Sequence, residues 1–142
     1  MRRLALLITV CAVSFTASAN SVDRLVTVVT SADPQTQLMA MVLTMQAIRA
    51  GASADILLCG PGGDLALASP PSSATAPQPP RDASPQGLLQ AAMEAGADVN
   101  VCAIYLPGRG EDSSVLLEGI AVAAPDRMAA TMMDPTVRVW SF

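Results

Sequence analysis

The chain has 142 residues and a formal charge of −4 at neutral pH, and 51% of its residues are hydrophobic while only 3% are aromatic. This length fits one domain with a sizeable core of aliphatic side chains and methionine. The sequence contains no histidine, which excludes Ser-His-Asp and Cys-His catalysis, histidine-based zinc sites and haem on a histidine ligand. An acidic chain without a basic stripe argues against nucleic acid and against an anionic membrane surface as partners.

Residues 1–19 have the features of a secretory signal peptide. The start is basic, residues 4–15 are apolar, and Ala17-Ser18-Ala19 forms a small-x-small cleavage site. The apolar run is too short to span a membrane, and charges, glycines or prolines interrupt every later one. We therefore expect export to a bacterial periplasm and a mature single domain covering residues 20–142. Loss of Arg2 and Arg3 leaves that domain with a charge of −6.

The first half of the mature chain alternates strand and helix patterns. Residues 23–30 predict a strand, and Asp33 and Pro34 then predict a helix start, since aspartate caps free backbone N–H groups and proline fits the first helical position. This helix is expected to end near Ala50, before Gly51, and to bury a stripe formed by Leu38, Met41, Val42, Met45 and Ile48. Residues 54–59 predict a second strand, followed by a helical turn near residues 65–67.

The second half continues this alternation after a proline-rich segment. Residues 69–83 hold five of the eleven prolines and predict a loop or semi-extended flap. Helices are then expected at residues 84–96, 113–118 and 125–133, and strands at 98–105, 120–123 and 137–142. Strands that alternate with helices and lack polar alternation predict an α/β fold. We expect an open, mostly parallel five-stranded sheet with helices on both faces and a flavodoxin-like topology.

Both cysteines of the mature domain belong to predicted buried strands: Cys59 ends the strand at residues 54–59, and Cys102 lies in the strand at residues 98–105. Ligands of open parallel sheets bind outside the carboxyl ends of the strands, and this edge is expected to carry five candidate residues: Ser31, Asp33, Cys59, Cys102 and Arg109. Disulfides are common in exported proteins. In a flavodoxin-like 2-1-3 strand order, however, the two cysteine-bearing strands lie about 9.6 Å apart. A disulfide needs Cα atoms within about 7 Å, so this strand order argues against one.

The segment GADVNVCAIYLPGRG, residues 96–110, resembles the cysteine segment of the DsrE/DsrF-like (TusD/YchN-like) family of sulfur-relay proteins. The turn TSADPQTQ, the strand ILLCGPGGDLAL and the ending LLEGIAVAAPDRMAATMMDPTVRVWSF resemble the same family, so the resemblance covers nearly all of the mature chain. It implies a DsrE/YchN-like fold, a homo-oligomer (trimer or hexamer), and a sulfur donor or acceptor as partner. In sulfur-relay members, a cysteine at the position matching Cys102 carries sulfur as a persulfide. The familiar members are cytoplasmic, whereas this chain is predicted to be exported.

The residues at this edge are compatible with persulfide chemistry and need no metal or cofactor. A thiolate accepts sulfane sulfur without a general base once it has formed. Arg109 could fold back over the Cys102 thiol and favour the thiolate, or bind an oxygen of thiosulfate or sulfite. We therefore assign the sulfur-carrying role to Cys102 and a substrate-binding role to Arg109, Cys59, Asp33 and Ser31. The activity is at most that of a sulfur carrier or sulfurtransferase.

Less specific interpretations remain open. Cys102 and Cys59 are also explained as small core residues, Asp33 as a helix cap and Arg109 as a solvated turn residue. The alternative function is a non-catalytic periplasmic module that binds a small anion, Cu(I) or a protein partner. The N–H groups of residues 60–63 could hold an anion. Cu(I) prefers soft sulfur ligands, but the methionines fall mostly on apolar helix stripes. A structural oligomer is a third possibility.

Overall fold

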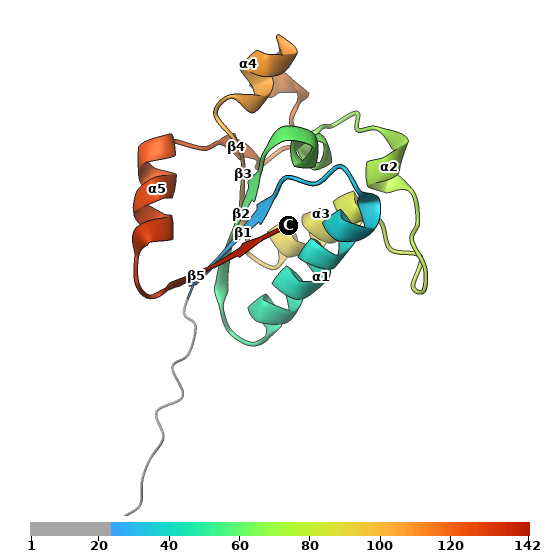
Figure 1. Cartoon of the computed structure of the whole chain (residues 1–142). Helices are drawn as coiled ribbons and strands as arrows, with labels where there is room; N and C mark the ends of the chain where they lie inside the picture. Colours follow the sequence, from blue (N-terminus) through green and yellow to red (C-terminus); the bar gives the residue numbers. More distant parts are fainter. Residues whose placement is uncertain (1–23) are drawn as a thin grey trace, which may run out of the picture.

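The computed structural model describes residues 24–142, so the predicted signal peptide lies outside the described residues. Five parallel strands form one sheet in the order β4-β3-β2-β1-β5 (Figure 1). The strands are β1 (Arg24–Val29), β2 (Ser53–Leu58), β3 (Asp98–Val101), β4 (Ala121–Val122) and β5 (Val137–Ser141). The predicted open five-stranded α/β sheet is confirmed.

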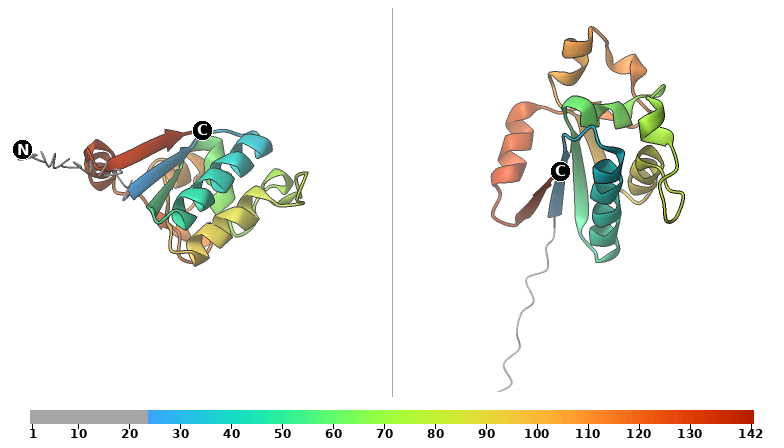
Figure 2. Two further views of the ribbon diagram at one scale, coloured as in Figure 1. Left: turned by 90° about the horizontal axis from the view of Figure 1, so that it is seen from below. Right: turned by 45° about the vertical axis from the view of Figure 1, so that its right-hand side comes forward.

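Helices cover both faces of the sheet. The helices α1 (Pro34–Arg49) and α3 (Pro85–Glu94) lie side by side on one face, and α5 (Pro125–Met133) lies on the other (Figure 2). Four shorter helical segments fill the connections: η1 (Gly60–Ala66), α2 (Ser72–Thr75), α4 (Tyr105–Arg109) and η2 (Ser113–Val115). Within the part of the chain that the structure describes, no helix has the length and apolar character needed to cross a membrane.

The strand order corrects the flavodoxin-like expectation. The strand β2 pairs with β1 on one side and with β3 on the other, so no strand separates β2 from β3. The chain steps from β1 to β4 in one direction and then crosses back to place β5 beside β1. The 2-1-3 order was wrong because β1, β2 and β3 all contribute buried aliphatic side chains to the core. Their composition does not encode which of them are neighbours.

The helix α1 begins and ends as predicted, but its buried stripe is shifted. Asp33 caps it by accepting a hydrogen bond from the backbone N–H of Thr36, and Gly51 after its end has a φ of +98°. Its buried residues are Gln37, Ala40, Met41 and Thr44, whereas the predicted Leu38, Val42, Met45 and Ile48 are half-buried. Small Ala40 and Thr44 let the helix approach the sheet closely, and the longer apolar side chains flank this contact.

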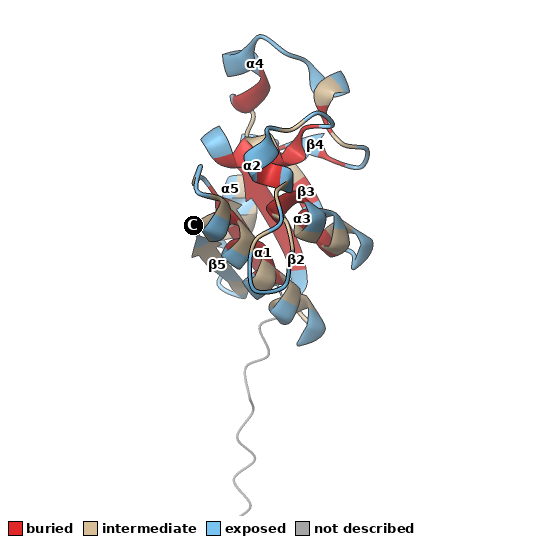
Figure 3. Cartoon of the chain, turned by 90° about the vertical axis from the view of Figure 1, so that its right-hand side faces the viewer, coloured by how far each residue is buried: buried red, intermediate tan, exposed pale blue. Residues whose placement is uncertain are grey.

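Three other segments differ from expectation. The strand β3 ends at Val101, and the chain enters the short helix α4 at Tyr105 instead of continuing as a strand. The proline-rich segment 69–83 is mostly loop, but it also contains the short helix α2, which buries Ala74 in the core. The last helix, α5, has the predicted bounds but no buried residue. The main core therefore lies between the sheet and the pair α1 and α3 (Figure 3).

Candidate functional site

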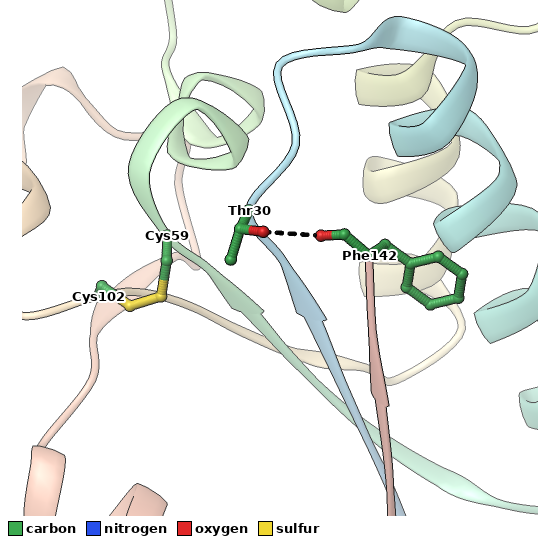
Figure 4. Close-up of a disulfide and its surroundings, with 4 residues drawn as sticks. All are labelled: Thr30, Cys59, Cys102 and Phe142. Carbon is green, nitrogen blue, oxygen red and sulfur yellow. Dashed lines mark hydrogen bonds between the residues drawn. A yellow bond between two sulfur atoms is a disulfide. The ribbon is translucent and has the colours of Figure 1, made fainter.

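The two cysteines form a disulfide at the carboxyl-end edge of the sheet (Figure 4). Leu58 of β2 pairs with Val101 of β3, so Cys59 and Cys102 are the next residues in the same register. The N–H of Cys102 donates to the carbonyl of Leu58 at 2.8 Å, which extends the pairing up to the cysteines. The Cα atoms of the cysteines are 5.0 Å apart. The expectation of unpaired thiols was wrong because it placed a strand between them.

The disulfide is accessible in part. Both cysteines are half-buried, and Ile104, two residues beyond Cys102, is 81% exposed. The chain after β3 therefore runs directly to the surface. A thiol or disulfide at this position can meet a small molecule or a partner without opening of the core.

The glycines after Cys59 serve close packing. A Cβ at Gly62 would collide with the backbone of Val29, and a Cβ at Gly63 would collide with the ring of Tyr105. The N–H of Gly62 donates to the carbonyl of Cys59 at 3.0 Å. Packing of η1 against β1 and α4 thus accounts for Gly62 and Gly63 without an anion.

A charged cluster joins the segments that follow the two cysteines. The Tyr105 hydroxyl donates to Asp64 Oδ1 at 2.7 Å, and Arg109 donates from Nη1 to the same oxygen at 3.3 Å. Arg109 Nε donates to Glu111 at 2.7 Å, and the guanidinium lies 5.5 Å from the Tyr105 ring centre. Burial raises the pKa of Tyr105, and the bond to Asp64 raises it further. The bond to Glu111 raises the pKa of Arg109.

This cluster changes the role expected of Arg109. It is the last residue of α4 rather than part of an open turn, and its charge is shared between two carboxylates. Sequence analysis missed Tyr105 and Asp64. The available signal was that Asp64 is the sole charged residue in the apolar stretch ILLCGPGGDLAL and that Tyr105 is the sole tyrosine of the chain.

Ser31 and Asp33 lie at the same edge, after β1. Asp33 accepts hydrogen bonds from the N–H and hydroxyl of Thr36 at 2.8 and 2.9 Å, which hold its pKa below the ordinary value. Ser31 Oγ accepts from the N–H of Asp33 at 3.1 Å, and its carbonyl accepts from Gln37 at 2.8 Å. Both residues therefore have local structural roles in starting α1. Their substrate-binding role stays a prediction.

Hydrogen bonds join the carboxyl ends of β1 and β5 beside the disulfide. The hydroxyl of Thr30 donates to the carbonyl of Phe142 at 3.0 Å (Figure 4), and the N–H of Thr30 donates to the same carbonyl at 2.8 Å. This is the place where the strand order reverses, and open α/β sheets often bind ligands there. Here the cysteines lie one strand away from that reversal, at β2 and β3.

A second feature is a cleft of about 340 Å³ between α5 and the sheet, close to the start of β1 and of β3. Arg24 donates from Nε and Nη2 to the two carboxylate oxygens of Asp55, at 2.7 and 3.0 Å. Asp55 is buried, and this pairing raises the pKa of Arg24. Asp98, Arg127 and Met128 also line the cleft. Among the described residues, no group of three or more acidic or cysteine side chains is placed to hold a metal ion.

Comparison with known proteins rests on structure alone. No protein-family profile matches the sequence, and no curated protein matches it either. Several solved structures share its architecture, and two of them do so over 84% of the chain. The fold is YchN-like. The YchN protein from E. coli has a TM-score of 0.60 and 16% identity, with 99% of its chain covered. MTH1491 from Methanobacterium thermoautotrophicum, a protein of unknown function, has a TM-score of 0.62 and 14% identity, with 98% covered.

The YchN-like fold agrees with the fold that the resemblance to the DsrE/DsrF-like family implied. At these identities the comparison concerns the arrangement of the backbone.

Proposed function

We propose that the protein is an exported, YchN-like sulfur-handling protein that accepts or relays sulfane sulfur as a persulfide on Cys102. The observation that supports it is the placement of Cys102, half-buried at the carboxyl end of β3, with a second cysteine within bonding distance. The resemblance of residues 96–110 to the cysteine segment of sulfur-relay proteins assigns the carrier role to Cys102 rather than to Cys59.

Loading of the reduced protein is a single displacement. The Cys102 thiolate attacks the outer sulfur of a sulfane donor, a bond forms between the two sulfur atoms, and the donor's remainder leaves. With thiosulfate the products are the Cys102 persulfide and sulfite, and with polysulfide a polysulfide shorter by one sulfur. No histidine is needed, because the thiolate itself is the nucleophile. The disulfide form has no free thiolate and cannot load by this step.

Intact mass spectrometry tests this proposal. The mature protein is reduced, freed of reductant and treated with polysulfide, beside Cys59→Ser and Cys102→Ser. We expect wild type and Cys59→Ser to gain one reducible sulfur atom and Cys102→Ser to gain none. A gain that survives in Cys102→Ser, or no gain in any form, contradicts the proposal.

Export and self-association are parts of the same proposal. Export is supported by the basic, apolar and small-residue pattern of residues 1–19. A homo-oligomer is supported by α5, which has no buried residue and leaves its face of the sheet incompletely covered. Secretion of a fusion carrying residues 1–19 and light scattering of the mature protein test these two points. A fusion that stays in the cytoplasm would contradict export. A monomer at micromolar concentration would contradict self-association.

A second candidate is a non-catalytic binding module for a small anion, Cu(I) or a protein partner. The α5 cleft supports it, because two arginines, Arg24 and Arg127, line a space large enough for a small molecule. Asp55 and Asp98 offset their charge, and the lining contains one thioether, Met128, which makes Cu(I) the weaker choice. Titration calorimetry of wild type and Arg127→Ala with sulfate and with Cu(I) shows whether the cleft binds sulfate, Cu(I) or neither.

A further inference from the structure

The segments that follow the two cysteines are acidic, which bears on the sulfur donor. In the segments 60–66 and 103–112 that follow the two cysteines, Arg109 is the sole basic residue, against Asp64, Glu111 and Asp112. Arg109 is bonded to both Asp64 and Glu111, so its charge is already compensated. A dianion such as thiosulfate is repelled by this surplus of carboxylates more strongly than a monoanion is. The charge at this edge therefore favours a donor with little or no charge.

The partial burial of the cysteines favours a small reactant. Both are half-buried. Hydrosulfide, together with its neutral acid, is the smallest sulfur nucleophile and carries at most one negative charge. It fits both the charge and the space at this edge.

The strand order distinguishes the two sulfur atoms. Displacement at a disulfide requires the nucleophile to approach in line with the S–S bond. For Cys59 that approach comes from the β1 side, where Thr30 is fixed by two hydrogen bonds to Phe142 (Figure 4). For Cys102 it comes from the side of β4, where the N–H of Ala123 donates to the carbonyl of Val101 at 2.8 Å, and the chain beyond Cys102 leads to exposed Ile104. The chain beyond Cys59 likewise reaches exposed Gly60, so it is the resemblance of residues 96–110 to sulfur-relay cysteine segments that assigns the attack to Cys102.

We propose that the Cys59–Cys102 disulfide captures hydrosulfide directly, which loads Cys102 with sulfane sulfur. This inference rests on the proposed function, since its product is the same Cys102 persulfide. Hydrosulfide attacks Cys102 Sγ, a new S–S bond forms, and the bond to Cys59 breaks. The sulfide sulfur is oxidised to the sulfane level, the Cys59 sulfur is reduced to a thiolate, and the proton of hydrosulfide passes to Cys59 or to solvent.

The structure itself holds the oxidant for this step, so one turnover needs no reactant other than sulfide. After the sulfane sulfur has passed to an acceptor, the chain is left as a dithiol. A further turnover requires an external protein disulfide to reoxidise it. In an oxidising compartment the disulfide is the resting form, and Cys59 then serves as the leaving group in loading.

The experiment treats the oxidised mature protein with sodium sulfide at near-equimolar concentration, followed at once by an alkylating agent and peptide mass mapping. Wild type that has been prereduced and freed of reductant is the redox control. Cys59→Ser treated with polysulfide is the control that shows whether Cys102 can carry sulfane sulfur. We expect oxidised wild type to gain one hydrogen sulfide equivalent, with a persulfide on Cys102 and an alkylated thiol on Cys59. Prereduced wild type and Cys59→Ser are expected to gain nothing from sulfide.

The possible failures are distinguishable. Oxidised wild type that stays unchanged, or becomes a dithiol without a persulfide, overturns the capture of hydrosulfide, while uptake of polysulfide sulfur by Cys59→Ser leaves the proposed function standing. A persulfide mapped to Cys59 overturns the assignment of Cys102 as the target. Failure of Cys59→Ser to take sulfur from polysulfide, with Trp140 fluorescence showing that it is folded, overturns the proposed function as well.

Discussion

The two faces of the sheet differ sharply in how they are covered. On the face toward α1 and α3, Thr27, Ile56, Leu58 and Val101 are fully buried. On the face toward α5, a cleft remains, and its floor contains the charged pair of Arg24 and Asp55. One face therefore carries the main hydrophobic core, and the other offers surface for a ligand or for another copy of the chain. The disulfide lies at the carboxyl-end edge between these faces, where its chemistry does not depend on disrupting the core.

The largest expected effect comes from the α1 and α3 face. Ile56→Ala removes a fully buried side chain and should lower the free energy of unfolding by about 2–5 kcal/mol. Met128→Ala, at a half-buried position on α5, should lower the free energy of unfolding by less than about 1 kcal/mol. Urea unfolding followed by the fluorescence of Trp140, the sole tryptophan, measures both. Equal losses would show that α5 packs as tightly as α1, contrary to the structure.

The charged pair in the cleft should give the next largest effect. Arg24→Ala leaves the buried Asp55 carboxylate without its partner and should cost about 1–3 kcal/mol. Arg127→Ala, at an exposed position that lines the same cleft, is the matched control and should change stability by less than about 0.5 kcal/mol. The same urea titration compares them. A similar loss in both variants would mean that the cleft's charge as a whole, and not the pair, is what matters.

The hydrogen bond between Tyr105 and Asp64 should affect the stability of the protein at alkaline pH. The pKa of Tyr105 is raised by burial and by this bond, so the folded protein keeps its proton above the ordinary value of about 10. Stability should therefore decline as the pH rises above about 10, where the unfolded chain loses this proton first. The tyrosinate absorbance of this sole tyrosine reports the titration directly.

Two variants test that assignment. Asp64→Asn should lower the pKa of Tyr105 toward the ordinary value without reaching it, because burial remains. Tyr105→Phe should cost about 0.5–1.5 kcal/mol at neutral pH and should abolish the part of the alkaline decline that Tyr105 causes. An unchanged tyrosinate titration in Asp64→Asn would contradict the role of the hydrogen bond.

The smallest effect is expected at the start of α1. The pKa of Asp33 is held down by hydrogen bonds from Thr36, so its contribution is present above about pH 4, the unfolded value, and is lost as the pH falls through the folded pKa. Asp33→Ala should be slightly less stable at neutral pH, and the difference from wild type should shrink in acid. Asp33→Ser keeps a cap without a titrating group and should not show this pH dependence. Thermal unfolding from pH 3 to 7 makes the comparison.

Local structure was largely predictable because its signals are local. Asp33 with Pro34 and Ser84 with Pro85 start helices by capping and by a fixed φ, and both effects act within a few residues. The start of α5 followed from Pro125, although Ala124 before it offers no side-chain cap. The break after Val101 was missed, because a β-branched run with Tyr105 resembles a strand until Tyr105 is seen to pack on Gly63 and Asp64.

The sequence by itself determined the alternation of strands and helices, the α/β class, and the placement of both cysteines toward the carboxyl-end edge of the sheet. These follow from periodicity, caps and turns, which involve neighbours along the chain. Only the tertiary structure decided that β2 and β3 are adjacent, that Cys59 meets Cys102, and that Arg109 is bonded to Asp64 and Glu111. Each of these depends on which elements pack side by side. Buried apolar strands are chemically alike, so the choice among them depends on the direction of the crossovers and on the packing of the whole domain.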